Sequence, residues 1–161
     1  MAKEKETKTN AMRILDQNGV VYKVHGYECD GFLEGTQVAD LLQQDYKMVY
    51  KTLVAVGKSN QYYVFVIPVD CELDLKKAAK AVSEKSVAML PLKDLTKVTG
   101  YIRGGCTAIG MKKQLETVID SGCEELEMIM VSGGRPGCQI ELKVSDYLLV
   151  SHAKMDGIIY E

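Results

Sequence analysis

Residue types that often reveal a function are scarce in this sequence of 161 residues. It contains two histidines, His25 and His152, which stand far apart in the chain. No Cys-x-x-Cys pair occurs among the five cysteines, and no cluster has the spacing of a zinc site, so we expect no metal ion. The odd number and wide spacing of the cysteines also argue against a disulfide framework and favour a reducing cytoplasm. The cysteines are Cys29, Cys71, Cys106, Cys123 and Cys138.

Long apolar runs and a strong net charge are also absent. No stretch is long enough to span a membrane, and residues 1–10 are nearly all charged or polar, so we expect neither a membrane partner nor a secretory signal. The formal charge of −2 argues against a protein that holds nucleic acid through charges spread over its surface, and we expect no DNA partner, but a local basic patch stays open. With 47% hydrophobic residues the chain can bury its own core, and we expect one domain over residues 1–161 with residues 1–8 as a flexible N-terminus.

Hydrophobic periodicity predicts helices that alternate with strands. We expect helices at residues 9–18, 36–44, 75–82, 91–98 and 145–150, and strands at residues 20–27, 49–56, 62–68, 86–89, 114–119, 126–131 and 138–142. Thr36, Asp74 and Ser145 are suitable N-caps, and Gly100 can end the fourth helix. The first strand should bury one of its faces. This order of elements favours an α/β or α+β fold with a mixed sheet that can curl into a barrel.

The most distinctive stretch is the glycine-rich segment at residues 100–113. It holds four glycines and ends in Lys112 and Lys113, so its backbone can approach an anionic ligand closely. The spacing differs from that of a nucleotide-binding loop, because Met111 and not lysine follows Gly110, and we expect no nucleotide or other cofactor. Backbone amides in such a segment can instead hold a carbonyl oxygen as it becomes negatively charged.

Side chains from other segments complete a minimal site for acyl transfer. Lys51 lies early in an apolar strand, where it is either a solvated edge residue or a charge delivered into a cleft. Hydroxyl groups are offered by Tyr27, Thr107 and Ser132. Cys106, inside the glycine-rich segment, is an alternative nucleophile, although no sequence signature places a histidine beside it.

Several blocks of sequence stand out together. They are Val49-Tyr50-Lys51-Thr52-Leu53, residues 100–110 followed by Lys112 and Lys113, and Val131-Ser132-Gly133-Gly134 with Ile140-Glu141-Leu142. In content, order and spacing these blocks resemble the YbaK/EbsC branch of the prolyl-tRNA-synthetase-associated editing domains. Weaker matches around His25 and Asp74 extend the similarity over nearly the whole chain.

The resemblance implies an α/β fold around a mixed, barrel-like sheet and a metal-free enzyme that deacylates mischarged aminoacyl-tRNA, typically Cys-tRNA(Pro). In such enzymes the cysteinyl thiol can attack its own carbonyl, so that the protein supplies orientation and charge stabilisation. The resemblance makes Lys51 the essential side chain and surrounds the ester with Gly105, Cys106, Thr107, Ala108, Ile109 and Gly110. Residues expected to bind the 3′ end of the tRNA are Tyr27, Arg103, Lys112, Lys113, Ser132, Gly133, Gly134 and Gln139. Prolyl-tRNA synthetase is a candidate partner.

Two positions depart from the family's pattern. Ala108 stands where the family's loop has a proline, and Gln139 stands where an aspartate is often found. A looser loop can change which small aminoacyl group fits, so Ala-tRNA(Pro) is an alternative substrate. Another alternative is a module that kept the fold, lost catalysis and binds a nucleotide end or a protein. The third alternative is a hydrolase that uses Cys106 as its nucleophile.

Overall fold

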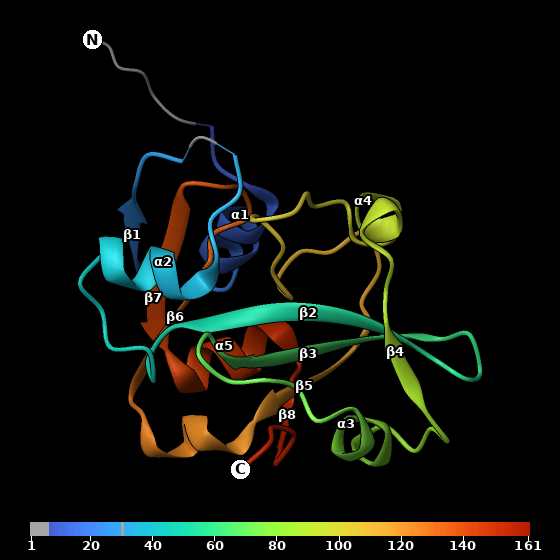
Figure 1. Cartoon of the computed structure of the whole chain (residues 1–161). Helices are drawn as coiled ribbons and strands as arrows, with labels where there is room; N and C mark the ends of the chain where they lie inside the picture. The colour runs from blue at the N-terminus through green and yellow to red at the C-terminus, as the bar shows by residue number, and fades with distance from the viewer. Residues whose placement is uncertain (1–6, 30) are drawn as a thin grey trace, which may run out of the picture.

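The computed structural model describes residues 7–29 and 31–161, which form an α/β domain (Figure 1). Most of the expected flexible N-terminus, residues 1–6, lies outside the described residues. The next two residues contact the domain. Thr7 accepts a hydrogen bond on its carbonyl oxygen from the Arg135 guanidinium at 2.6 Å, and Lys8 is hydrogen-bonded to Asp16.

Helices and strands alternate along the described chain. The α-helices are α1 (Asn10–Gln17), α2 (Gly35–Leu41), α3 (Leu75–Ala81), α4 (Leu95–Thr99) and α5 (Val144–Ser151), and the 3-10 helices are η1 (Leu92–Asp94) and η2 (Ser121–Glu125). The strands are β1 (Tyr22–Gly26), β2 (Tyr50–Gly57), β3 (Tyr62–Pro68), β4 (Val87–Met89), β5 (Glu116–Asp120), β6 (Met128–Ser132), β7 (Cys138–Lys143) and β8 (Lys154–Asp156). The helices and strands expected from periodicity are confirmed, with ends shifted by a few residues. No helix in the described ranges is long and apolar enough to cross a membrane.

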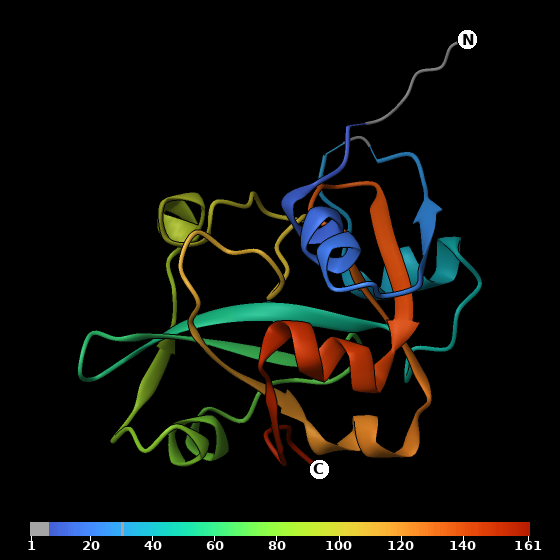
Figure 2. The ribbon, with the colours of Figure 1, turned by 180° about the vertical axis from the view of Figure 1, so that it is seen from behind.

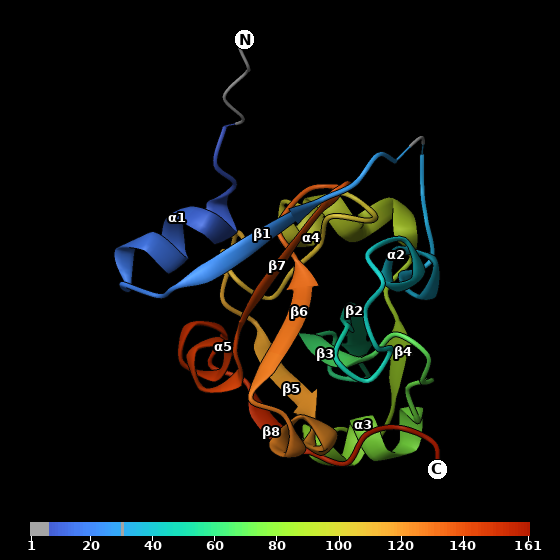
Figure 3. The same ribbon diagram turned by 90° about the vertical axis from the view of Figure 1, so that its left-hand side faces the viewer.

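The strands form two sheets that meet at a corner. One sheet is antiparallel with the order β1-β7-β6, and the other is mixed with the order β4-β2-β3-β5-β8 (Figures 1 and 3). They are joined by a parallel bridge between Val49 and Met130, where the Met130 amide donates to the Met48 carbonyl oxygen at 2.9 Å. The expected mixed, barrel-like sheet is therefore two sheets connected at one corner.

Helices cover the sheets and enclose the core. The larger cluster of buried side chains includes Leu15, Ile109 and Tyr147 and lies beneath α1 and α5, which are in front in Figure 2. A second cluster, around Phe65, lies between β3 and α3. Val64 belongs to the larger cluster, so β3 is buried on both of its faces. This central strand anchors β2, its antiparallel neighbour.

Capping predictions were correct for one of three named residues. The Asp74 side chain accepts hydrogen bonds from the first amides of α3, as expected. The N-cap predictions for Thr36 and Ser145 were wrong. Helix α2 begins at Gly35 and α5 begins at Val144, so both residues lie inside their helices. At α2 the backbone amide of the N-cap, Glu34, donates to the Gln37 side chain at 2.8 Å. Gly100 ends α4 with a φ of 87°, which confirms the expected stop.

The first strand differs from its prediction. No residue of β1 is buried, and the Val24 side chain is 50% exposed. The reason is topological, since β1 pairs with β7 alone and lies at the edge of the smaller sheet (Figure 3). Alternation in sequence indicates a strand but does not show whether another layer covers it.

Candidate functional site

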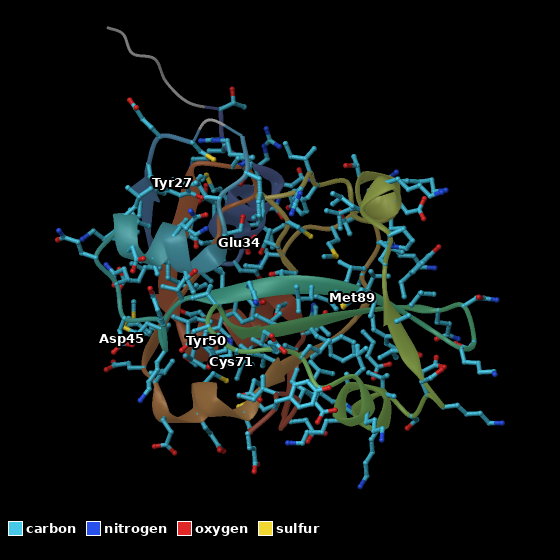
Figure 4. All side chains as sticks on the ribbon, in the orientation of Figure 1. Tyr27, Glu34, Asp45, Tyr50, Cys71 and Met89 are labelled. Carbon is cyan, nitrogen blue, oxygen red and sulfur yellow. The ribbon has the colours of Figure 1, made fainter. Side chains whose placement is uncertain are left out.

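A pocket of about 340 Å³ opens near the corner where the two sheets meet. Its walls come from the edge of β2, the facing ends of β6 and β7, the segment between β1 and α2, the segment from β4 to α4, and the glycine-rich segment. In Figure 4, Tyr27 and Glu34 mark the wall between β1 and α2, and Met89 marks the wall that runs from β4 to α4. The pocket therefore depends on segments that are far apart in the sequence.

Lys51 lines the pocket from the edge of β2. On that edge Val49, the residue before β2, is bridged to the smaller sheet, and hydrogen bonding on the β4 side begins at Val54, whose carbonyl oxygen accepts from the Leu90 amide at 3.0 Å. The stretch between them has no paired strand on that side, so it is open to the pocket. Lys51 is partly buried and forms no ion pair with another described residue. Its ammonium group is available to an anionic or polarised group of a ligand.

Two buried oxygen atoms of the pocket residues have no hydrogen-bond partner within the described part of the chain. They are Thr52 Oγ1 and Gln139 Oε1. A buried polar atom without a partner costs about 1–3 kcal/mol, so its presence beside a cavity is consistent with a role in ligand binding. Tyr27 interacts with Gln139, and burial raises the pKa of the Tyr27 hydroxyl. At neutral pH Tyr27 is therefore a neutral group that can donate a hydrogen bond.

Ser132 and Gln139 are register partners on β6 and β7, and both line the pocket. The Ser132 hydroxyl accepts a hydrogen bond from the Gly134 amide at 3.2 Å, and the Gly133 amide donates to the Cys138 carbonyl oxygen at 2.8 Å. A Cβ at Gly133 would lie 2.5 Å from Cys138 Sγ. Gly133 and Gly134 thus shape the turn behind Ser132 and do not themselves line the pocket.

The glycine-rich segment is a loop closed by its own hydrogen bonds. The Tyr101 hydroxyl donates to the Ile109 carbonyl oxygen at 2.7 Å, and the Lys112 amide donates to the Thr99 carbonyl oxygen at 3.0 Å. Thr107, Ala108 and Ile109 are buried and lie outside the pocket. The residues of this loop that line the pocket are Arg103, Gly104 and Cys106.

Cys106 has the properties of a neutral thiol. Burial raises its pKa from 9.0 to about 12, so it is protonated at neutral pH. Neither histidine lines the pocket, and His25 Nε2 is hydrogen-bonded to Glu141 at 2.9 Å. The pocket therefore holds no histidine that would activate Cys106 as a nucleophile.

Arg103 and Phe32 connect two walls of the pocket. The Arg103 guanidinium carbon lies 3.8 Å from the centroid of the Phe32 ring, a cation–π contact between the glycine-rich loop and the segment before α2. Phe32 is 42% exposed, so the stacked pair is accessible to solvent. It presents a positive, flat surface in the wall of the pocket that Lys51 also lines.

Lys112 and Lys113 lie elsewhere. They line a second hollow, together with Lys97 and Tyr62, and neither belongs to the pocket of Lys51. Gly110, which precedes them, has a φ of 79° and lies outside the pocket as well. Gly105, within the loop, is buried and packs against the backbone of Arg135.

The structure thus brings together six of the residues predicted for the site. They are Lys51, Cys106, Tyr27, Arg103, Ser132 and Gln139. It does not place Gly105, Thr107, Ala108, Ile109, Gly110, Lys112, Lys113, Gly133 or Gly134 in the pocket wall. Sequence reasoning gave no role to Thr52, Phe32 or Glu34, which do line it. A threonine within a strand and an acidic residue before a helix are ordinary features, so no local signal distinguished them.

The arrangement favours stabilisation of developing negative charge over metal or nucleophilic chemistry. Among the described residues no group of three or more His, Cys, Asp or Glu could hold a metal ion. The pocket offers a lysine, a neutral tyrosine, unsatisfied oxygen atoms and a protonated thiol. Such a set can orient an ester and stabilise its carbonyl oxygen.

Solved structures with the same fold cover nearly the whole chain. A structure provisionally titled as a trans-editing enzyme for prolyl tRNA synthetase matches 97% of this chain and all of its own, with a TM-score of 0.83 and 20% identity. The protein APE2540 matches with a TM-score of 0.85 and 17% identity, over 94% of this chain and 99% of its own. At these identities the likeness shows the fold alone.

Sequence comparisons identify the family. The profile described as "Aminoacyl-tRNA editing domain" matches residues 35–149. A protein of Enterococcus faecalis, provisionally named Cys-tRNA(Pro)/Cys-tRNA(Cys) deacylase EbsC, is 48% identical over 160 residues, which cover 98% of each protein. The profile covers most of this chain, and the relative covers nearly all of it. The chain belongs to the aminoacyl-tRNA editing domain family.

Proposed function

We propose that this protein removes the amino acid from mischarged aminoacyl-tRNA, with Cys-tRNA(Pro) as its main substrate. Family membership and the name of the 48% identical relative support the reaction class. The structural observation that carries the proposal is that Lys51 and Cys106, from β2 and the glycine-rich loop, line one pocket of about 340 Å³. A cavity of this size is at the lower end for ligand sites and suits a small aminoacyl ester.

The bond to be broken joins the aminoacyl carbonyl carbon to a ribose oxygen at the 3′ end of the tRNA. In a substrate-assisted route the cysteinyl sulfur attacks its own carbonyl carbon. The C–S bond forms, the C–O bond to ribose breaks, and the thiol proton passes to the ribose oxygen. In a hydrolytic route water takes the place of the sulfur. Negative charge develops on the carbonyl oxygen in both routes, and Lys51 stabilises it.

The other pocket residues position the ester. The Gly105 amide donates to Ile102 O at 2.9 Å and the Ile109 amide to Thr107 Oγ1 at 3.4 Å. The Cys106 amide has no such partner in the described part of the chain, and we assign it as a second donor to the carbonyl oxygen. Tyr27, Thr52 and Gln139 hold the polar atoms of the aminoacyl group. Arg103, stacked on Phe32, lies where it can contact the adjacent phosphate.

Cysteine and alanine differ by one sulfur atom, so size is a weak basis for choosing between them. A hydrophobic pocket discriminates by about 1–3 kcal/mol per methylene. A thiol that takes part in the reaction gives a larger preference, because the alanyl ester has no internal nucleophile. Ala-tRNA(Pro) remains the alternative substrate, and its removal would require the hydrolytic route.

The selected tRNA and the cellular location are part of the proposal. All tRNAs share the same 3′ terminal sequence, so a pocket for the terminal ester cannot by itself select tRNA(Pro). We assign that selection to prolyl-tRNA synthetase acting as a partner. The five cysteines are free, which suits a reducing cytoplasm.

A deacylation assay over a panel of charged tRNAs tests the proposal. We expect fast release of cysteine from Cys-tRNA(Pro), slower release from Ala-tRNA(Pro), and none from correctly charged Pro-tRNA(Pro). Adding prolyl-tRNA synthetase should increase the preference for tRNA(Pro) over tRNA(Cys). Measurable tRNA binding without release of any amino acid would refute the enzyme and favour a catalytically inactive binding module of the same fold.

A further inference from the structure

A second hollow, of about 760 Å³, lies beside the candidate active site. It is bounded by the tip of the β2–β3 hairpin, the C-terminal end of α4, and the segment that leads into β5. Figure 2 shows this segment, coloured gold, running down from the level of α4 towards β5. We call this second hollow the lysine hollow, because Lys97, Lys112 and Lys113 line it.

The charge in the lysine hollow is positive. Its lining contains three lysines and one acidic residue, Glu116, which is already paired with Lys154 at 3.9 Å. Lys112 Nζ donates to the Lys97 carbonyl oxygen at 3.1 Å, a contact that leaves its charge uncompensated. Lys113 has no hydrogen-bond or ion-pair partner in the described part of the chain, and Lys97 has one distant carboxylate at 3.8 Å. In a protein whose net charge is −2, this concentration of lysines is a local feature.

Its neutral groups also suit RNA. Tyr62 is 38% exposed and provides an aromatic face for a base or ribose. Asn60 and Gln61 add amide groups that can donate to phosphate or to the 2′-hydroxyl, whereas the Gln114 amide nitrogen already donates to the Leu115 and Ser151 carbonyl oxygens. Lysines around an aromatic residue and side-chain amides are the combination that RNA-binding surfaces use.

The lysine hollow and the pocket are separated by a single short helix. Leu95 of α4 lines the pocket, whereas Lys97 and Val98 of the same helix line the hollow. A nucleic acid whose terminal ester occupies the pocket can therefore continue past α4 into the hollow without crossing the rest of the domain. A phosphate there would meet Lys112 and Lys113, neither of which has a carboxylate partner among the described residues, and Lys97, whose partner Asp94 is 3.8 Å away.

We propose that the lysine hollow binds the RNA backbone of the acceptor end of the tRNA while the ester occupies the pocket. This inference rests on the proposed function and adds a contact that the pocket does not supply. Lys97, Lys112 and Lys113 bind phosphates, and Tyr62 contacts the sugar or base between them. The pocket recognises the ester, and the hollow supplies affinity for the longer RNA.

The test compares a long and a short substrate on one variant. The variant carries Lys97→Gln, Lys112→Gln and Lys113→Gln, and the control carries the same charge change at the exposed residues Lys23, Lys47 and Lys76, which line neither cavity. The substrates are full-length Cys-tRNA(Pro) and a cysteinyl ester of adenosine. With the tRNA we expect the KM of the variant to rise about tenfold and its kcat to stay near wild type. The slope of log KM against the logarithm of the salt concentration should fall by about 2 to 3, about one for each lysine removed.

With the cysteinyl adenosine ester we expect no difference among wild type, variant and control. An equal loss of activity of the variant on the tRNA and on the adenosine ester would overturn the inference, because it would indicate damage to the pocket. An unchanged KM and salt dependence for the tRNA would also overturn it, and would leave an acidic protein surface as the occupant of the hollow.

Binding of uncharged tRNA, measured by fluorescence anisotropy, separates this inference from the proposed function. If wild type releases no amino acid but its tRNA affinity still depends on the three lysines, the enzyme assignment fails and the RNA site stands. If wild type deacylates and the lysines have no effect on binding, the RNA site fails and the enzyme stands.

Discussion

Gly105 lies against the backbone of Arg135 so closely that a Cβ at Gly105 would be 2.6 Å from Arg135 Cα. This contact joins the glycine-rich loop to the second glycine turn, which follows β6. Cys106 is adjacent to one side of the contact and Ser132 lies near the other, and both line the pocket. Backbone atoms have little freedom to move, so the contact sets the separation of two pocket walls.

Gly105→Ala should destabilise the protein, because its methyl group has no space against backbone atoms. Overpacking of this kind costs about 1–3 kcal/mol, and the shift of the loop should also lower deacylation. Gly157→Ala is the matched control, since its Cβ would meet its nearest neighbour, Ser121 Oγ, at 3.9 Å. The free energy of unfolding, measured with denaturant, checks both. Equal stability of the two variants would contradict the close packing of Gly105.

Lys51→Ala should leave the fold intact and abolish most of the activity. Lys51 forms no ion pair with another described residue, so its removal should cost little stability. Loss of one group that stabilises an oxyanion typically lowers kcat by about 10²–10³-fold. Release of cysteine from Cys-tRNA(Pro) is the measurement, and circular dichroism verifies folding. Full activity in a folded Lys51→Ala variant would refute the role given to this lysine.

Thr52→Val should separate stability from activity. The substitution keeps the shape of the side chain and removes a buried hydroxyl that has no partner in the described structure, so stability should stay equal or rise by up to about 1 kcal/mol. Activity should fall, because the hydroxyl is assigned to the substrate. Thr117→Val is the control: its hydroxyl donates to the Leu115 carbonyl oxygen at 2.9 Å, far from the pocket wall, so stability should fall and activity per folded molecule should persist. Unchanged kinetics in Thr52→Val would remove Thr52 from the site.

Cys106→Ser should retain deacylation within about threefold of wild type, since a protonated thiol does not act as a nucleophile. Reaction rates at pH 7–9 should also show no dependence on the state of this thiol. Labelling with a thiol-directed reagent, followed by mass spectrometry, shows independently whether the Cys106 thiol is reactive. Loss of all turnover in a folded Cys106→Ser variant would instead support the cysteine-dependent hydrolase.

Two thiols with raised pKa values, the partly buried Cys106 and the buried Cys123, should make stability fall at alkaline pH. Burial raises the pKa of Cys106 to about 12 and that of Cys123 to about 11, from 9.0. Below pH 9 the thiols are protonated in both the folded and the unfolded protein, and their contribution to the free energy of unfolding is complete. This contribution is lost as the pH rises towards 11–12, because the unfolded chain releases its thiol protons first. The slope is at most about 1.4 kcal/mol per pH unit for each thiol.

Denaturant unfolding between pH 8 and 10.5 measures this slope. A variant with Cys106→Ser and Cys123→Ala should have a shallower decline than wild type. Cys29→Ser, at a partly exposed position, is the control. Identical slopes in all three proteins would show that Cys106 and Cys123 do not govern the loss of stability at alkaline pH.

The sequence predicted local structure well, because local signals determine it. Asp74 before an apolar stripe and Gly100 after one marked the ends of helices that the structure contains. Val24 shows the limit of such signals: its strand was correct, but its exposure depends on which layers assemble around the sheet. The strand at Lys154–Asp156 was not predicted, because three exposed residues carry no periodicity and the strand forms by pairing with β5.

The site was predictable only in part, because it also depends on how segments far apart in the sequence assemble. Lys51 was left as either an edge residue or a cleft residue, and it is both, because the unpaired edge of β2 forms the pocket wall. Phe32 enters the site through its contact with Arg103, some seventy residues away in sequence, which no local pattern could reveal. Lys113 was expected with the residues that bind the 3′ end of the tRNA, but it lines the second hollow and not the pocket of Lys51.

The hydrogen bonds that close the glycine-rich loop have a geometric consequence. The Lys112 amide is tied to the Thr99 carbonyl oxygen, and the Tyr101 hydroxyl to the Ile109 carbonyl oxygen, so the two ends of the loop cannot drift apart. One part of this loop walls the pocket and its last residues line the lysine hollow. The closed loop is therefore a spacer of fixed length between the two cavities, and an insertion within it should change the distance from the pocket to the lysine hollow.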